Sequence, residues 1–332
     1  MMFQRILVPL DGSARAERAL TVAARLARAS GGSIVLLQAV GIPAANSTYR
    51  YGAVARIPII AQDELDAEKA QAEAYLATVL QREVLAGITT EAKTVRGVAA
   101  TVIEDLANEG RIDLIVMCSH GDTGFKRWVL GSVAQKVSRY SRVPVLVLHQ
   151  EGSKPDTPFP DRLRPLRSIM AVVALDGSEF AEAAIEPAAN LVSVLASPAQ
   201  GTLILTRVVQ LSAVGTMSAT NERAVDEAQA YLGDVLRAHA ALAKKLGVML
   251  TTSVALGKDV ADALIRAAEQ GEEAEGKRLT GNCDLIALTT HGRSGLQRMS
   301  MGSVTEHVLG ATKLPLLVVH TPTRKEGILP VT

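Results

Sequence analysis

The sequence predicts an α/β protein made of two tandem, doubly wound domains, each with a five-stranded parallel sheet covered by helices. Three observations lead to this prediction. The chain has 332 residues, which is about the length of two domains. It contains an internal repeat, with similar short motifs in the same order in each half. Within each half, short apolar runs alternate with helical segments, the order that a parallel βαβ sheet requires.

The internal repeat is visible in pairs of motifs. The first motif ends in Asp-Gly-Ser in both copies, at 11–13 and 176–178. A second motif is DLIVMCSHG at 113–121 and DLIALTTHG at 284–292, and the copies end in VPVLVLH (143–149) and LPLLVVH (314–320). The copies lie 160 residues apart at Gly97 and Gly257 but 171 apart at His149 and His320. The second copy therefore gains residues, and the polar, glycine-containing stretch 269–281 reads as a surface insertion.

Five strands are expected in each copy, and in the first copy they follow from short apolar runs. Residues 6–10 are rich in β-favouring side chains, and residues 33–40 are apolar along their length, as in a strand buried on both faces. Residues 88–95, 113–118 and 143–148 complete the set. The repeat places equivalent strands in the second copy.

Four helices are expected between these strands. Residues 14–29 carry Ala and Leu at helical spacing, with Ser13 as a candidate N-cap. Residues 62–86 form one long helix with polar and apolar positions, and shorter helices are expected at 98–108 and 131–142. This strand–helix alternation predicts a Rossmann-like sheet in each copy.

The repeat also sets the domain boundaries. We expect a first domain at 1–150 and a second at 167–321. The linker between them, residues 151–166, contains four prolines and is expected to be extended. Residues 322–332 remain as a C-terminal tail.

Composition argues against several classes of protein. Lys and Arg number 35 and Asp and Glu 34, so a net charge of +1 provides no field for nucleic acid or an anionic membrane. The two cysteines, Cys118 and Cys283, exclude a disulfide scaffold and a four-cysteine metal site, and they suit a reducing compartment. No signal peptide and no apolar run of membrane-spanning length is recognised. A cytoplasmic location is the expectation.

The repeated polar residues fall where a doubly wound sheet binds ligands, outside the carboxyl ends of its strands. Asp11 and Asp176 follow the first strand of each copy. Gly131-Ser132 and Gly302-Ser303 open the helix after the fourth strand, where free N–H groups and the helix dipole suit a phosphate. The simpler interpretation is that the aspartates stabilise a turn and that the Gly-Ser pairs are ordinary helix starts. Recurrence in both copies favours the ligand interpretation.

The loops at 119–132 and 290–303 resemble the phosphate loop of the universal stress protein family, whose ATP-binding pattern is Gly, two residues, Gly, nine residues, Gly-Ser/Thr. Nine residues separate Gly121 from Gly131, and nine separate Gly292 from Gly302. The opening Leu-Asp-Gly-Ser and the closing Val-Pro-Val-Leu-Val are also similar to that family. The resemblance covers both copies nearly end to end and implies its adenine nucleotide alpha hydrolase-like fold.

The resemblance also implies a role for particular residues in binding ATP, with or without Mg²⁺. The aspartates would lie beside the adenosine, backbone at the end of the second strand would meet adenine, and the glycines and serines would hold the phosphates. These implied positions are Asp11, Val40, Gly97, Gly121, Gly131 and Ser132 in the first copy, and Asp176, Val209, Gly257, Gly292, Gly302 and Ser303 in the second. The pattern's first glycine is replaced by Cys118 and Thr289, side chains that could crowd the ribose or phosphate.

Histidine and cysteine invite other interpretations. His120 and His291 have no partner at metal-ligand spacing, so loop histidines that border the ligand are favoured over catalytic or metal roles. His307 has no counterpart, because Lys136 occupies its place in the first copy, and a surface role is the default. Cys118 could be a redox sensor if exposed and ionised, but a buried inert thiol is the preferred interpretation.

The functional hypothesis is a tandem universal stress protein, a stress-response or regulatory module that binds adenine nucleotide with little or no hydrolysis. The alternative is a nucleotide-independent interaction protein with vestigial pockets, its protein partner unknown. A third hypothesis, an adenylate-using enzyme, lacks a visible set of acceptor-activating residues. The family commonly dimerises through its last strand, here 143–148 and 314–319, and such apolar edges need a cover. The copies can pair within the chain, or a homodimer can form.

Overall fold

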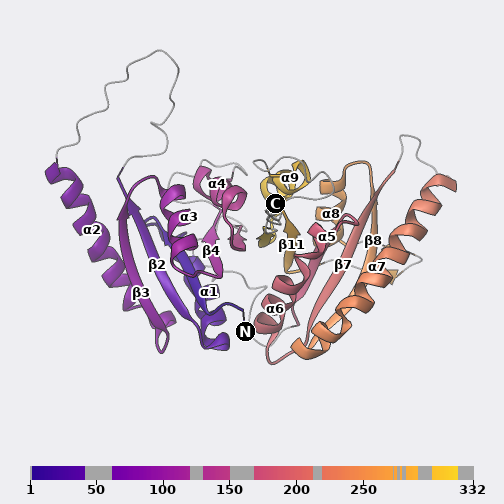
Figure 1. Cartoon of the computed structure of the whole chain (residues 1–332), viewed down its shortest axis with the longest axis horizontal. Helices are drawn as coiled ribbons and strands as arrows, with labels where there is room; N and C mark the ends of the chain where they lie inside the picture. Colours follow the sequence, from indigo (N-terminus) through magenta and orange to yellow (C-terminus); the bar gives the residue numbers. More distant parts are fainter. Residues whose placement is uncertain are drawn as a thin grey trace, which may run out of the picture.

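The computed structural model describes residues 2–41, 62–119, 130–149, 168–211, 219–271, 273–274, 277–278, 282–290 and 301–320. These residues form an α/β structure whose two halves lie side by side (Figure 1). The expected linker and C-terminal tail lie outside the described residues.

The first half contains five parallel strands in the order β3-β2-β1-β4-β5. The strands are β1 (Arg5–Leu10), β2 (Ser33–Val40), β3 (Thr89–Arg96), β4 (Leu114–Cys118) and β5 (Val145–Leu148). The helices are α1 (Arg18–Ser30), α2 (Gln62–Leu80), the short 3-10 helix η2 (Glu83–Leu85), α3 (Ala99–Glu109) and α4 (Ser132–Tyr140). The strand order reverses between β1 and β4, which is the switch point of this half.

The second half repeats this topology in the order β12-β11-β6-β7-β8, again with parallel pairs. The strands are β6 (Met170–Leu175), β7 (Gly201–Gln210), β8 (Val248–Gly257), β11 (Leu285–Thr289) and β12 (Leu316–Val319). The helices are α5 (Glu179–Glu182), α6 (Ile185–Ala196), α7 (Ala219–Leu246), α8 (Val260–Glu269) and α9 (Ser303–Ala311). Its switch point lies between β6 and β11.

Within the predicted insertion, two short strands form an antiparallel pair. They are β9 (Glu273–Ala274) and β10 (Lys277–Arg278). The insertion therefore adds to the second copy without entering its main sheet.

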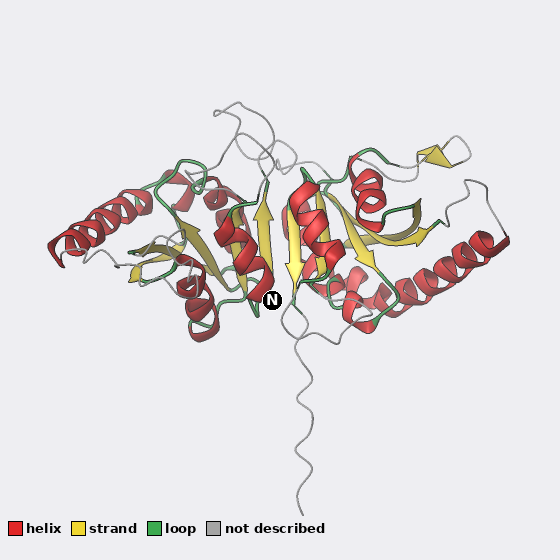
Figure 2. Ribbon diagram, turned by 90° about the horizontal axis from the view of Figure 1, so that it is seen from above, coloured by secondary structure: helices red, strands yellow, loops and turns green. Residues whose placement is uncertain are grey.

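The two halves join edge to edge through β5 and β12, which pair antiparallel. Val145 faces Val318, Leu146 faces Leu317 and Val147 faces Leu316 in the register, so the strands combine into one ten-stranded sheet. Figure 2 shows the two central strands running in opposite directions. Of the two arrangements that the sequence left open, the structure has the copies paired within the chain through their last strands.

Helices reinforce the join on both faces of the sheet. On one face α1 packs against α6, and the Arg25 guanidinium donates to the carbonyl oxygen of Leu195. On the other face, Arg139 of α4 pairs with Glu306 of α9 at 2.9 Å.

The apolar core is divided between the two faces of the sheet. One apolar cluster lies under α1, α2, α6 and α7, and another under α3, α4, α8 and α9. Each cluster includes buried residues of both halves.

Two helix boundaries differ from the prediction by more than two residues. The helix expected at 14–29 begins at Arg18, because residues 14–17 form a turn whose Ala16 N–H donates to Ser13 Oγ at 3.1 Å. Ser13 thus caps this turn and not α1. The helix expected at 62–86 ends at Leu80, and η2 follows it. Neither break coincides with a glycine or a proline, the residues that usually mark a helix end in a sequence.

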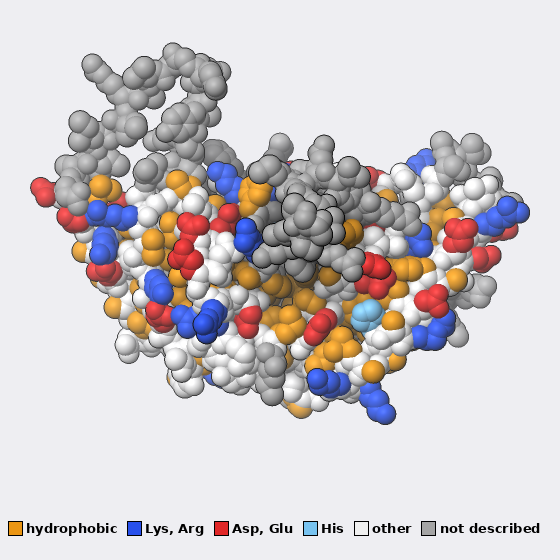
Figure 3. Space-filling model, viewed as in Figure 1, with side chains coloured by type: hydrophobic (Ala, Val, Ile, Leu, Met, Phe, Trp, Pro, Cys, Tyr) orange, Lys and Arg blue, Asp and Glu red, His pale blue; other side chains and the backbone are white. Residues whose placement is uncertain are grey.

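The surface fits the near-zero net charge. On the face shown in Figure 3, acidic and basic side chains are intermixed over both halves. Among the described residues, no helix combines the length and the hydropathy needed to cross a bilayer.

Candidate functional site

The first strand of each half ends in an aspartate that organises the next turn. Asp176 Oδ1 accepts from the Ser178 N–H at 3.0 Å and from its hydroxyl at 2.6 Å, and Asp11 makes the same two bonds to Ser13. The intervening Gly177 has φ +90°, a conformation that favours glycine. The turn-stabilising role is therefore real in both copies, and it fixes each carboxylate at the carboxyl edge of the sheet.

The start of α9 is held against the end of β11. The Gly302 N–H donates to the Thr290 carbonyl at 2.8 Å, and Thr305 Oγ1 donates to the Thr289 carbonyl at 2.8 Å. Gly302 is the N-cap and makes no side-chain cap hydrogen bond, while Ser303 is exposed. The first N–H groups of α9, together with its dipole, thus point toward the carboxyl edge of the sheet.

The first copy builds the same helix start. The Gly131 N–H donates to the Ser119 carbonyl at 2.8 Å, and the backbone angles of Gly131, φ −61° and ψ 142°, nearly equal those of Gly302 at −61° and 146°. Ser132 is exposed as Ser303 is. The repeat in the sequence is therefore a repeat in local geometry.

At the second switch point these elements surround a cavity of about 430 Å³. Three of the predicted residues, Asp176, Gly302 and Ser303, line it together. Thr289 and Arg207 line it as well. The volume lies within the range of about 300–1,000 Å³ that is usual for small-molecule sites.

Four further predicted residues, Val40, Gly97, Val209 and Gly257, lie at or next to the carboxyl ends of strands. Val40 and Val209 are buried at the ends of β2 and β7, and the Val40 carbonyl accepts from the Gly97 N–H at 3.0 Å. Val208 and Gln210, the neighbours of Val209, line the cavity, whereas Val209 and Gly257 are not among its lining residues. Gly121 and Gly292, with His120 and His291, lie outside the described residues.

Gly97 and Gly257 have a packing role that the motif did not reveal. A Cβ on Gly97 would lie 2.8 Å from Val102 Cγ2, and one on Gly257 would lie 2.6 Å from Ala263 Cβ. Real Cβ atoms essentially never approach so closely. Glycine therefore allows α3 and α8 to pack close to the ends of β3 and β8.

Arg207 is a cavity residue that sequence reasoning missed. Its guanidinium lies 5.3 Å from the centre of the Tyr231 ring, within cation–π range, and the Tyr231 hydroxyl donates to Glu182 at 2.9 Å. Gln38 takes the equivalent place on β2, since Leu175 pairs with Arg207 as Leu10 pairs with Gln38. The sequence held a signal for Arg207, because it is the one cation in the otherwise uncharged strand GTLILTRVVQ and lies near the carboxyl end of that strand.

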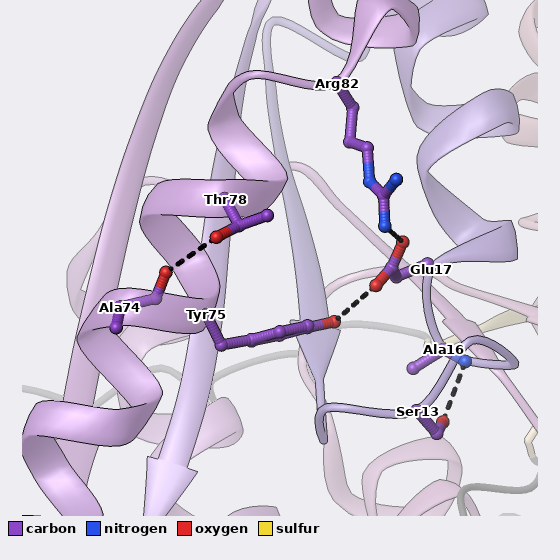
Figure 4. Close-up of polar contacts among 7 residues, drawn as sticks. All are labelled: Ser13, Ala16, Glu17, Ala74, Tyr75, Thr78 and Arg82. Atoms are coloured by element: carbon purple, nitrogen blue, oxygen red, sulfur yellow. Dashed lines mark hydrogen bonds and ion pairs between the residues drawn. The ribbon is translucent and has the colours of Figure 1, made fainter.

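The tyrosine–glutamate pair recurs in the first copy. The Tyr75 hydroxyl donates to Glu17 at 3.2 Å, and Arg82 pairs with the same carboxylate at 3.0 Å (Figure 4). Burial and the glutamate raise the pKa of Tyr75 and of Tyr231 above the usual range. Both phenols therefore stay protonated as donors, and they tie α2 to the turn at 14–17 and α7 to α5.

The thiol of Cys118 is kept neutral. Its Sγ donates to the Arg15 carbonyl at 3.0 Å, and burial raises its pKa to about 12. A neutral thiol is a poor nucleophile at neutral pH. The geometry therefore supports the inert-thiol interpretation over the redox sensor.

The fold and this edge define a class: a doubly wound α/β protein with two pseudo-symmetric copies and a small-molecule cavity at a switch point. The model of the universal stress protein family matches the chain twice, at residues 2–149 and 170–320, and the chain belongs to that family.

Individual relatives agree with this assignment. The universal stress protein YxiE of Bacillus subtilis is 32% identical over 148 residues, which are 44% of this chain and 99% of YxiE. A solved universal stress protein from Archaeoglobus fulgidus covers 96% of this chain with a TM-score of 0.62 and 20% identity, and 99% of that chain is covered. One from Pseudomonas aeruginosa covers 96% with a TM-score of 0.59 and 16% identity, and 93% of that chain is covered. These two structures share the fold over both copies.

Proposed function

We propose that the chain is a regulatory module that binds adenine nucleotide, and that the cavity of the second copy is an ATP site. The observation that carries the proposal is the convergence of Asp176, Gly302 and Ser303 on one cavity of about 430 Å³ at the switch point. In doubly wound folds this is the place where ligands bind.

The lining of the cavity suits both the phosphates and the nucleoside of a nucleotide. The start of α9 offers N–H groups, a positive dipole end and the Ser303 hydroxyl to phosphate oxygens. Asp176 directly follows β6, and its carboxylate can accept from ribose hydroxyls. Apolar residues such as Leu175, Val260 and Leu288 supply contact surface for a base. With the phosphates at α9 and the adenosine toward Asp176, the N–H donors of α9, the Ser303 hydroxyl and the Asp176 carboxylate would all have a partner on the nucleotide.

ATP acts in this proposal as a ligand and not as a rapidly consumed substrate. The charged residues that line the described cavity are Asp176 and Arg207. Fast phosphoryl transfer needs a group that orients the attacking water and cations that neutralise the transferred group. A bound nucleotide that favours one conformation over another would be the regulatory event.

A charge placed at the start of α9 tests the proposal. Ser303→Asp puts a carboxylate at the first helical position, where it stabilises the helix but repels phosphate. Ser132→Asp is the matched control, since it makes the same change in the first copy. We expect Ser303→Asp to weaken binding of Mg·ATP at the second-copy site by at least about tenfold in a calorimetric titration of nucleotide-stripped protein. Ser132→Asp should leave that site intact.

The same titration separates the alternatives. Wild-type affinity in Ser303→Asp would contradict the phosphate assignment. No heat with wild-type protein would favour the interaction protein with vestigial pockets. Two sites per chain, one lost in each variant, would extend the proposal to the first copy.

A further inference from the structure

Helices α8 and α9 bring together a histidine and two aspartates that are distant in the sequence. His307 Nε2 lies 3.2 Å from Asp262 Oδ1, and His307 Nδ1 lies 3.7 Å from Asp259 Oδ1. One ligand atom from each of the three residues can be chosen so that all lie within 4.8 Å of one another. The three side chains are exposed, so solvent reaches them.

The helices fix these three residues. Asp259 is the N-cap of α8 and accepts from the Asp262 N–H at 2.9 Å. Asp262 follows in the first turn of α8, and His307 lies on α9, which packs against α8. A carboxylate has two oxygens, so Asp259 can keep its cap bond and still offer an oxygen to another partner.

The first copy shows that the fold does not need this cluster. Val98 is the N-cap of α3, the place that Asp259 takes in α8. Three residues on, Thr101 stands where the second copy has Asp262, and Lys136 stands where it has His307. The α3–α4 pair packs without a histidine or a carboxylate at those positions. The second copy thus carries three potential ligands at positions where the first copy has none.

We propose that Asp259, Asp262 and His307 form a site for a divalent transition-metal ion, with Zn²⁺ as the best-matched member. Imidazole and carboxylate oxygen are the donors that Zn²⁺ takes from proteins, at about 2.0–2.2 Å. A tetrahedral ion with such bonds has ligands about 3.4 Å apart, and the distance of 3.2 Å between His307 and Asp262 is close to this value.

The donor set also sets the selectivity. Mg²⁺ and Ca²⁺ prefer oxygen ligands only, whereas imidazole favours Zn²⁺, Ni²⁺ and Cu²⁺. Three protein ligands leave a coordination position for water, which makes this an open site at the surface. It is independent of the proposed nucleotide cavity, because none of the three residues lines that cavity.

The test is a titration of nucleotide-free protein with Zn²⁺ by calorimetry and with Co²⁺ by visible absorption. His307→Lys gives α9 the residue of the first copy, and Asp262→Thr does the same for α8. Asp259→Ser removes a carboxylate but keeps an N-cap side chain. Each variant should bind Zn²⁺ at least about tenfold more weakly, because even outer-shell partners of a metal contribute that much. Circular dichroism should show unchanged folding.

A graft provides the converse test. The triple variant Val98→Asp, Thr101→Asp, Lys136→His rebuilds the cluster between α3 and α4, and it should add one Zn²⁺ per chain. The proposal is overturned if wild-type protein binds no Zn²⁺ or Co²⁺, or if the ion binds equally well to His307→Lys and Asp262→Thr. The ATP titration does not depend on either result.

Discussion

At the scale of single residues, the two copies repeat contacts that no local motif indicates. The Tyr75–Glu17 bond spans 58 positions and the Tyr231–Glu182 bond spans 49. A motif scan reads neighbours in sequence, so it found Asp11 and Asp176 but not these pairs. The pairs join the long helices α2 and α7 to the segments that follow β1 and β6, beside the carboxyl edge of the sheet.

Removing these hydroxyls should destabilise the chain. Tyr75→Phe and Tyr231→Phe each lose a hydrogen bond to a carboxylate, which we expect to lower the free energy of unfolding by about 1 kcal/mol. Tyr140→Phe is the control, because Tyr140 is exposed on α4. Urea unfolding measures all three, and a loss no larger than that of the control would refute the structural role.

The reactivity of Cys118 should follow its raised pKa. A thiol with a pKa of about 12 in the folded chain stays protonated at pH 7 and at pH 9, whereas an unfolded thiol ionises near 8.5. Its contribution to stability is therefore complete below about pH 8.5 and is lost as the pH rises toward 12.

Alkylation followed by mass spectrometry checks this expectation. Native protein should react at Cys118 far more slowly than urea-unfolded protein at both pH values. Cys118→Thr introduces the residue that the second half has at this position, Thr289. In this variant the free energy of unfolding should fall less at alkaline pH than in the wild-type protein. Fast native labelling at pH 7 would revive the redox-sensor interpretation.

At the scale of elements, the alternation of apolar runs and helical segments was enough to predict the order of strands and helices. Parallel strands need crossover helices, so the order of elements determines much of the topology. Helix ends were harder to predict. The turn at 14–17 and the break after Leu80 depend on Ser13 and on η2, and no glycine or proline stands at either place to mark it in the sequence.

Two glycines of the second copy should respond oppositely to alanine. Gly257→Ala places a Cβ 2.6 Å from Ala263 Cβ, so α8 must shift, at a cost of about 1–3 kcal/mol. Gly310 lies in α9, and a Cβ added to it would meet no atom of the described residues within 4 Å. Gly310→Ala should therefore stabilise the chain by up to about 1 kcal/mol. Thermal unfolding measures both, and equal signs would contradict the packing argument.

At the scale of the whole molecule, the β5–β12 pair makes one sheet from two copies. The apolar runs 143–148 and 314–319 indicated a need for cover, but they could not show whether a second chain supplies it. In the structure each of these strands covers the edge of the other within one chain, with Val145–Val147 paired to Leu316–Val318. The outer strands are then β3 and β8, and β3 carries Glu91, Lys93 and Arg96, charges that discourage edge pairing.

The chain should therefore be a monomer. Because β5 and β12 are already paired with each other, the edge through which a dimer was expected is occupied. Size-exclusion chromatography with light scattering should give the mass of one chain across a wide concentration range. A stable mass of two chains would show that another surface of the molecule associates.

We propose that the cavity of the second copy holds an adenine nucleotide between α9 and Asp176. The most direct test is a crystal structure of the chain grown with excess Mg·ATP. We expect phosphate density against the N–H groups of residues 303–305 and the Ser303 hydroxyl, with the adenosine extending toward Asp176. An empty cavity at saturating ATP, or a nucleotide bound elsewhere, would contradict it.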